Sequence, residues 1–400
     1  MEPHLRIRAH RAEADEDMRH WWIAPAVLAL SACATPEIAP VQPSSLLRDE
    51  VFQARPVPAD PDVFAVSDSM RRYLEVEIAR QLRTQGHLHG LVAALQSSTQ
   101  LKLDYDAAVT RTAAEAFEAR SGNCLSLTIM TAALARELGL SVSFRRAFSA
   151  EAWTRRDNTL FLGGHVNIML ARAPAERLWG LDRVSGIIVD FLPHEDLRRQ
   201  RSWEIRENTV TAMFMNNRAA ETMAAGLLDE AYWWARGAIR QDPRFLEAVN
   251  TLGVIYFRHG NLAEAERAFQ FVLAQETENT SALSNLANVL ETQGREKAAL
   301  ALRDKLQRIE PYPPFHFSDL GFAALKRREF EAARGYFARE LARNAAYHEA
   351  QFGLAVAYLG LGDSKAAQRH LAAALEASTT RREHDIYAAK LEWLRSHRAQ

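Results

Sequence analysis

The chain is poor in cysteine, in long apolar runs and in excess charge of either sign. Only two cysteines occur in 400 residues, which excludes a fold held together by many disulfides. No stretch reaches the ~18 consecutive apolar residues that a membrane-spanning helix needs. A formal net charge of −1 gives no general attraction to nucleic acid. With 48% hydrophobic and 25% charged residues, the composition is that of a folded protein, and the length allows two or three domains.

The first cysteine ends a segment that is typical of secretion. Residues 19–33 contain a short basic start, a run of apolar residues and small residues before Cys33. The ending Leu30-Ser-Ala-Cys33 resembles the bacterial lipobox. That resemblance implies cleavage before Cys33 and a lipid on its thiol. The alternative is an uncleaved apolar anchor in which the cysteine stands by chance.

Residues 1–33 are predicted to be a signal peptide, and a tether is predicted to follow it. Acidic residues in 1–17 do not suit a signal, so Met18 is the expected true start. Residues 34–50 are rich in proline and serine, as in a tether that holds a domain off a surface. By the resemblance, Ala34 after the lipidated cysteine favours sorting to the outer membrane. We therefore expect a lipid-anchored envelope protein that faces the periplasm.

The C-terminal half contains an internal repeat. Small residues recur every 34 positions, a second small series follows twelve residues later, and glycines mark the turn between them, with Arg328 as the departure. The period resembles that of tetratricopeptide repeats, in which each unit is two antiparallel helices. We expect five units over 209–381 and a capping helix over 382–400. The alternative is an alanine-rich helical domain with coincidental spacing. The first series is Ala219, Gly253, Ala287, Gly321 and Ala355.

The part between, residues 51–208, is predicted to be a separate domain. Residues 44–110 have mixed apolar and polar spacing that favours entry helices. His87 and His89 form a pair that sometimes binds metal. Without a third ligand nearby, a solvated loop is the better interpretation, and no metal site is expected.

The second cysteine stands at the start of a predicted helix. Ser121-Gly-Asn supplies turn and cap residues, and an apolar helix follows until Gly139. Cys124 therefore falls on the first helical turn, where unpaired N–H groups and the helix dipole favour a thiolate nucleophile. The alternative is a buried structural cysteine, which is the usual fate of a free thiol.

Two predicted strands carry polar residues in apolar surroundings. Residues 159–170 alternate like one strand, with His165, Asn167 and Met169 on the same face. Residues 186–193 form a second apolar strand that contains Asp190. A charge in such a run is costly unless it is paired. Either residue alone could be structural.

Together these segments resemble the transglutaminase-like superfamily, a papain-related fold, over residues 105–200. The motif is Arg120-Ser-Gly-Asn-Cys124, a helix ending Ala135-Arg-Glu-Leu-Gly139, then a strand His165 and a strand Asp190. The resemblance implies that Cys124 attacks an acyl carbon, His165 moves the proton and Asp190 orients the imidazole, without metal or cofactor. Asn167 is considered as a second oxyanion donor beside the Cys124 backbone N–H.

The expected fold class is therefore α+β: a papain-like transglutaminase core followed by an all-α repeat superhelix. The leading hypothesis is a lipid-anchored cysteine hydrolase or acyltransferase that acts on a peptide or protein amide. Its repeats would bind the substrate or a protein partner on their concave face. The rival hypothesis is a non-catalytic adaptor lipoprotein in which both parts only bind proteins. The geometry around Cys124 distinguishes the two.

Overall fold

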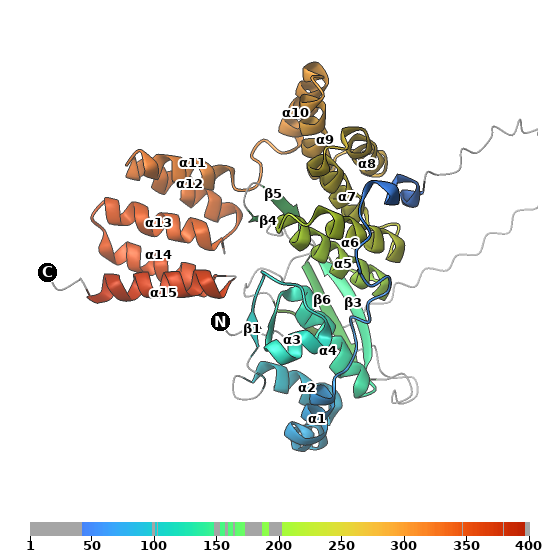
Figure 1. The fold of residues 1–400 in the computed structure, drawn as a ribbon. Helices are drawn as coiled ribbons and strands as arrows, with labels where there is room; N and C mark the ends of the chain where they lie inside the picture. The colour runs from blue at the N-terminus through green and yellow to red at the C-terminus, as the bar shows by residue number, and fades with distance from the viewer. Residues whose placement is uncertain are drawn as a thin grey trace, which may run out of the picture.

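The computed structural model describes residues 42–97, 101, 103–147, 153–156, 159–162, 165–172, 186–191, 202–345, 347–378 and 380–396. The predicted signal segment, Met18 and Cys33 lie outside the described residues. A part that mixes helices and strands comes first, and paired helices follow it (Figure 1). No helix within these ranges is long and apolar enough to cross a membrane.

The end of the predicted tether packs on the helical repeats. Residues 43–51 form two short 3₁₀ turns, and the Tyr256 hydroxyl donates a hydrogen bond of 2.8 Å to the Leu46 carbonyl. The Phe52 ring stacks on Tyr232 with 4.1 Å between centroids. The described end of the predicted tether, residues 43–50, is thus packed on the repeats, because burial of its apolar residues is favourable.

The predicted entry helices are present. They are α1 (Asp68–Arg72), a π-helical turn (Tyr73–Glu77) and α2 (Ala79–Gln96). His87 and His89 lie exposed on α2 and not in the predicted loop, so that expectation was wrong. A kink at Gly86, where φ is 76°, separates them from the first part of α2.

The helix that carries the second cysteine is buried on almost every side. It is α4 (Cys124–Glu137), and all its side chains from 125 to 135 are buried. A helix that is apolar all round belongs inside a domain. Gly139, with φ of 72°, follows its end in the left-handed conformation that glycine adopts freely. The short α3 (Ala113–Ala119) packs beside it.

A four-stranded antiparallel sheet lies against α4 (Figure 1). The order is β7-β6-β3-β8. The Thr128 hydroxyl of α4 donates to the Val166 carbonyl of β6 over 3.3 Å, which ties the helix to the central strand. The strands are β3 (Ser141–Ala147), β6 (His165–Ala171), β7 (Ile187–Val189) and β8 (Ser202–Ile205).

The predicted single strand over 159–170 is two strands. β5 (Thr159–Leu162) pairs with β4 (Trp153–Arg156) in a separate hairpin, and β6 begins at His165. The reason is the register, because His165 lies opposite Ala147, the last residue of β3. Within the described residues, the pairing of β6 with β3 begins at His165.

Five antiparallel helix pairs follow, as the 34-residue period predicts, and their neighbouring helices pack on one another. A final helix, α15 (Arg381–Ser396), stands at the predicted cap and buries Tyr387, Leu391 and Leu394. The pairs are α5 (Glu207–Ala224) with α6 (Leu228–Gln241), α7 (Leu246–His259) with α8 (Leu262–Gln275), α9 (Thr280–Thr292) with α10 (Glu296–Ile309), α11 (His316–Lys326) with α12 (Phe330–Arg343), and α13 (His348–Gly360) with α14 (Ser364–Glu376).

The turn inside each pair needs one residue with positive φ. Glycine takes this position in four of the five pairs. In the remaining pair, α11 with α12, the residue is Arg328, with φ of 60°. A left-handed non-glycine residue costs about 1–2 kcal/mol. The departure in sequence is therefore not a departure in backbone geometry. The glycines are Gly226, Gly260, Gly294 and Gly362.

The array is interrupted between its third and fourth pairs. Pro311, Pro313 and Pro314 cannot take interior helix positions, and α11 starts only at His316, with 11 residues. One apolar core joins the sheet, α4 and the first three pairs, whereas α11–α13 and α13–α15 have small cores of their own. The first three repeats thus share one apolar core with the sheet.

The small residues of the repeat are required by close packing, and this can be tested in the fourth pair. A Cβ at Gly321 would lie 2.7 Å from the fully buried Phe337 ring, whereas a Cβ at Gly335 would meet nothing within 4 Å. We expect Gly321→Ala to destabilise the array by about 1–2 kcal/mol through overpacking. Gly335→Ala should instead stabilise it by about 0.5–1 kcal/mol through helix propensity. Urea unfolding followed by circular dichroism measures the free energy of unfolding of each variant. Equal effects of the two substitutions would contradict the claim that Gly321 is required by close packing.

Candidate active site

Cys124 is the first residue of α4, as predicted. Asn123 caps the helix, because its side-chain oxygen accepts a 2.9 Å hydrogen bond from the Ser126 N–H. The cysteine is half-buried and its thiol is free. It therefore lies at the positive end of the α4 dipole with partial access to solvent, and is not an enclosed core residue.

His165 and Asp190 form a buried pair. His165 opens β6, and Asp190 follows β7, which pairs with β6 so that Ile168 lies opposite Val189. This register brings the two side chains to the same end of the sheet, where His165 Nε2 lies 2.8 Å from Asp190 Oδ2. Both residues are buried. The carboxylate of Asp190, which would be costly to bury alone, is thus paired with the His165 imidazole.

The second nitrogen of the His165 ring is left for Cys124. Nδ1 is buried, and no aligned hydrogen-bond partner for it occurs among the residues that the structure describes. Burial alone would lower the pKa of His165, but hydrogen bonding and charge from Asp190 and Cys124 outweigh it and raise the pKa to about 10. The structure therefore brings all three predicted residues into one cluster, with an imidazole that favours its protonated form.

The side chain of Asn167 contacts the carboxylate of the buried pair. Its amide Nδ2 donates a hydrogen bond of 3.1 Å to Asp190 Oδ2. Asn167 precedes Ile168, which pairs with Val189, and Asp190 directly follows Val189. One N–H of the Asn167 amide is therefore used by the buried pair, and Asn167 as an oxyanion donor stays a prediction.

Tyr105 belongs to the site and was missed in the sequence. It lies on β1 (Asp104–Tyr105), which runs parallel to β2 (Ser121–Gly122), just before the cysteine. Burial first, and then the negative charge of Cys124 and of Asp190, raises the pKa of Tyr105, while a hydrogen bond with the Cys124 backbone partly offsets this. The phenol thus lies at the head of α4 and keeps its proton. No local motif could have identified it, because only the β1–β2 pairing brings it there.

The cluster combines a thiol, an imidazole and a carboxylate from separate elements of the fold. No group of three or more His, Cys, Asp or Glu side chains that could hold a metal occurs within the described ranges. His87, from the predicted His pair, has its Nδ1 2.9 Å from the Leu138 carbonyl oxygen. The thiol comes from the head of α4, the imidazole from the first residue of β6 and the carboxylate from the residue after β7.

Comparison with known proteins identifies the repeat region. The tetratricopeptide repeat family model matches residues 250–314 and 319–384. The chain therefore contains tetratricopeptide repeats, and the break between the two matches falls at the start of α11. No curated protein matches the chain.

Solved structures similar to the chain are repeat proteins. MamA shares 18% identity, with 42% of this chain and 91% of that chain covered and a TM-score of 0.24. YrrB, described as a tetratricopeptide protein with an unusual peptide-binding site, shares 19% identity over 45% of this chain and 92% of that chain, with a TM-score of 0.24. A thermophilic tetratricopeptide protein of Thermus thermophilus shares 20% identity over 46% of this chain and 99% of that chain, with a TM-score of 0.28.

The buried pair predicts a specific pH dependence of stability. The pKa of His165 is about 10 in the folded protein, against about 6.5 when unfolded. The stabilisation is therefore fully present below pH 6.5 and is lost as pH rises through 10. We expect Asp190→Asn to cost about 1.5–3 kcal/mol below pH 6.5, and less as pH rises. The measurement is urea unfolding at several pH values.

The control for this experiment is Asp49→Asn. Asp49 pairs with Arg236 over 2.8 Å. Burial acts to raise the pKa of the Asp49 carboxyl, but hydrogen bonds from Arg236 and Tyr232 outweigh it and hold that pKa below its usual value, so Asp49 stays charged between pH 6.5 and 10. Its cost should therefore stay constant across that range. A constant cost for Asp190→Asn as well would show that His165 is not held protonated.

Proposed function

We propose that the protein is a cysteine hydrolase or acyltransferase that acts on a peptide or protein amide, with Cys124 as its nucleophile. The observation that carries this proposal is the His165 ring. Its Nε2 lies 2.8 Å from Asp190 Oδ2. Its buried Nδ1 has no aligned hydrogen-bond partner among the described residues, and the Cys124 thiol, which raises the pKa of the ring, is the group proposed to pair with it. A nucleophile, a base and a group that orients the base are the three parts that covalent acyl transfer requires.

The proposed reaction needs only these groups. The Cys124 sulfur, as thiolate, attacks the amide carbonyl carbon and forms a C–S bond. His165, protonated, gives its proton to the amine as the C–N bond breaks, which leaves a thioester on Cys124. Water or a second amine then attacks the thioester carbon and gives its proton to His165, and the sulfur leaves. Asp190 holds the ring in orientation and balances its charge throughout.

Tyr105 is proposed as the second oxyanion donor. The Cys124 backbone N–H at the start of α4 is one donor for the oxygen that becomes negative in the tetrahedral intermediate. The protonated phenol of Tyr105 hydrogen-bonds with the backbone of Cys124, and the negative charge of the Cys124 thiolate contributes to its raised pKa. A substrate oxygen would take the place between the two donors.

The fold supports a transglutaminase-like core. A helix with cysteine at its first position packs on an antiparallel sheet. The histidine opens β6, and the aspartate directly follows β7, the neighbouring strand. This is the order that the sequence resemblance requires. The choice between water and an amine as acceptor then depends on the substrate that the repeats present.

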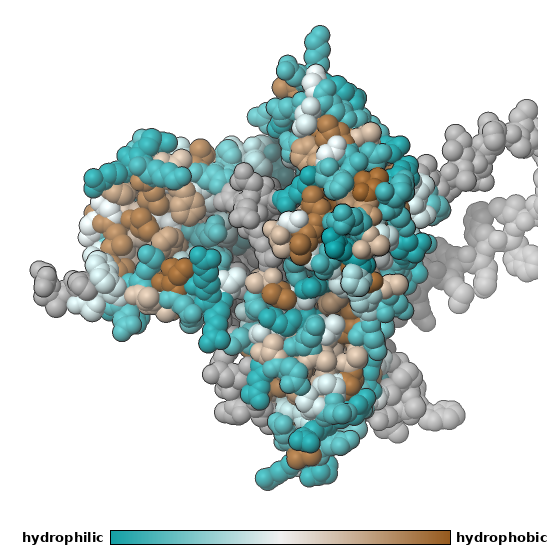
Figure 2. Space-filling view, viewed as in Figure 1, coloured by the Kyte–Doolittle hydropathy of each residue, from teal (hydrophilic) through white to brown (hydrophobic). Residues whose placement is uncertain are grey.

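The repeats are proposed to recruit that substrate or a protein partner. Arrays of this kind bind extended peptides and helices. Figure 2 shows apolar surface over the C-terminal block of helices α11–α15. Several large apolar side chains of this block are exposed, as is typical of a surface that binds another protein. They are Leu359, Leu361, Ile386 and Trp393.

A second candidate function is a non-catalytic adaptor. The comparisons favour it in one respect, because what they identify is the repeat region. An adaptor requires the same repeats and makes no demand on Cys124. The reactivity of that thiol therefore separates the two functions.

The reactivity of Cys124 is the first test. We expect iodoacetamide to alkylate Cys124 at pH 7 at least about tenfold faster than an ordinary cysteine, because an adjacent imidazolium stabilises the thiolate. His165→Gln should reduce the rate about tenfold or more, and Cys124→Ala should abolish labelling of this peptide without unfolding the protein. Peptide mass spectrometry measures the rate at each cysteine separately.

The control is His89→Gln, which replaces an exposed histidine on α2 and should leave the rate unchanged. If Cys124 of the wild-type protein reacts no faster than an ordinary thiol, the enzyme proposal fails and the adaptor remains.

We also propose that the chain is held at the outer membrane, facing the periplasm, by a lipid on Cys33. The support is the lipobox-like ending Leu30-Ser-Ala-Cys33 after a short apolar run. The wild-type protein should then incorporate labelled palmitate in cells and sediment with membranes, and Cys33→Ser should do neither. Cys124→Ala is the matched control and should keep the lipid. Palmitate label on the Cys33→Ser protein would contradict the anchor.

A further inference from the structure

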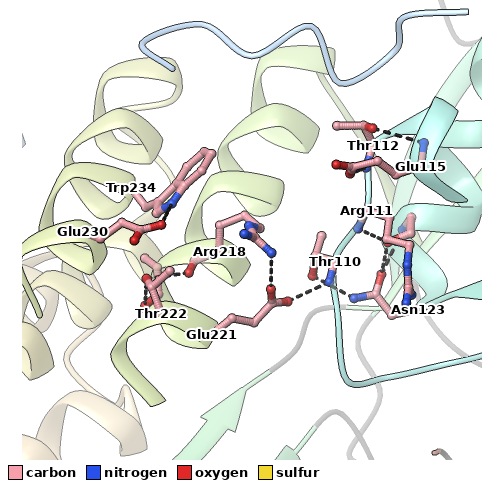
Figure 3. Close-up of polar contacts among 12 residues, drawn as sticks. Thr110, Arg111, Thr112, Glu115, Asn123, Arg218, Glu221, Thr222, Glu230 and Trp234 are labelled. Carbon is pink, nitrogen blue, oxygen red and sulfur yellow. Dashed lines mark hydrogen bonds and ion pairs between the residues drawn. The ribbon is translucent and has the colours of Figure 1, made fainter. Parts of the chain in front are cut away.

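A carboxylate of the first repeat reaches into the domain that carries Cys124. Glu221, near the end of α5, accepts a 2.7 Å hydrogen bond from the backbone N–H of Thr110 (Figure 3). Its other oxygen accepts from Arg218 on the same helix at 2.9 Å. Thr110 belongs to the loop between β1 and α3, which is the loop that follows Tyr105.

That loop is bonded directly to the cap of α4. Asn123 Nδ2 donates to the Thr110 hydroxyl over 2.9 Å, and Asn123 Oδ1 accepts from both the N–H and the hydroxyl of Ser126 at 2.9 Å. The Arg111 N–H donates to the same Ser126 hydroxyl over 2.8 Å. Glu221, Thr110 and Asn123 thus form a continuous relay that ends at the residue before Cys124.

The relay is shielded from water along its length. Thr110 is 2% exposed and Asn123 is 9% exposed. The Glu221 side chain retains 15% exposure, half that of Arg218 at 31%. Shielded hydrogen bonds hold geometry more firmly than exposed ones, and an unpaired N–H at Thr110 would carry the full penalty of a buried donor. Glu221 is therefore more than one half of a surface ion pair.

We propose that Glu221 is a positioning residue that holds Cys124 in its reactive placement through Thr110 and Asn123. The inference rests on the proposed function, since it concerns the reactivity of the same thiol. It makes the first repeat a structural part of the active site and not only an appended binding module. An array displaced from the domain would leave the cap of α4 without its outer support.

The test compares two substitutions at Glu221 in the full chain. Glu221→Ala removes the acceptor for Thr110, whereas Glu221→Gln keeps an oxygen at the same place and loses only the charge. We expect Glu221→Ala to slow alkylation of Cys124 by iodoacetamide at pH 7 about threefold to tenfold, the size of one lost cap or hydrogen bond. The midpoint of the rate against pH should move upward. Glu221→Gln should stay within about twofold of wild type.

Two further variants separate positioning from general stability. Glu247→Ala breaks a different contact between the repeats and the sheet, the ion pair with Arg146 of β3, and should leave the pH profile of Cys124 unchanged. Thr110→Val interrupts the relay at its centre and leaves the repeats intact. If the relay acts as one unit, Thr110→Val and Glu221→Ala together should slow alkylation no more than either alone. If Glu221→Ala does not fold, the comparison is made with Thr110→Val.

The outcomes distinguish this inference from the proposed function. A reactive wild-type Cys124 with an unchanged rate and pH midpoint in Glu221→Ala overturns the relay and leaves the enzyme proposal standing. Independent, additive effects of the two relay substitutions also overturn it. An unreactive wild-type Cys124 overturns both.

Discussion

The site depends on one buried hydrogen bond, between His165 Nε2 and Asp190 Oδ2 at 2.8 Å. A carboxylate and an imidazole removed from water are costly unless each satisfies the other. By taking Nε2, Asp190 leaves Nδ1 as the free nitrogen and raises the pKa of the ring. In the proposed function, the pairing of β6 with β7, the packing of α4 on β6 and the position of Cys124 matter because this bond leaves Nδ1 for the thiol.

The first three repeats and the sheet share one apolar core, and this changes the meaning of the repeat array. Linked domains usually meet through small, polar and movable contacts. Here Phe52 stacks on the first repeat, Glu221 bonds to Thr110, and Arg146 pairs with Glu247. The part after the proline-rich break has separate cores. The first three repeats thus share their core with the domain that carries Cys124, whereas the repeats after the break form cores among themselves.

Local signals predicted the elements well, and long-range pairing decided the rest. The Asn123 cap and Gly139 bracket α4 in the sequence, and the 34-residue period locates each helix pair. The order of His165 and Asp190 could be read, but their contact depends on the register of β6 and β7. Tyr105 and Glu221 carried no signal, because Tyr105 reaches the head of α4 through the pairing of β1 with β2, and Glu221 contacts Thr110, which is 111 residues away in the sequence. The strand over 159–170 was wrong because alternation does not show where a partner strand ends.

The most direct test of the account is the ionisation of His165 in the native protein. Nitrogen-15 NMR of labelled histidine reports the protonation of each ring nitrogen as pH is varied, and Asp190→Asn identifies the resonance. The account predicts that His165 stays doubly protonated through neutral pH and titrates near 10. A His165 that loses its proton near 6.5, as an ordinary histidine does, would contradict it.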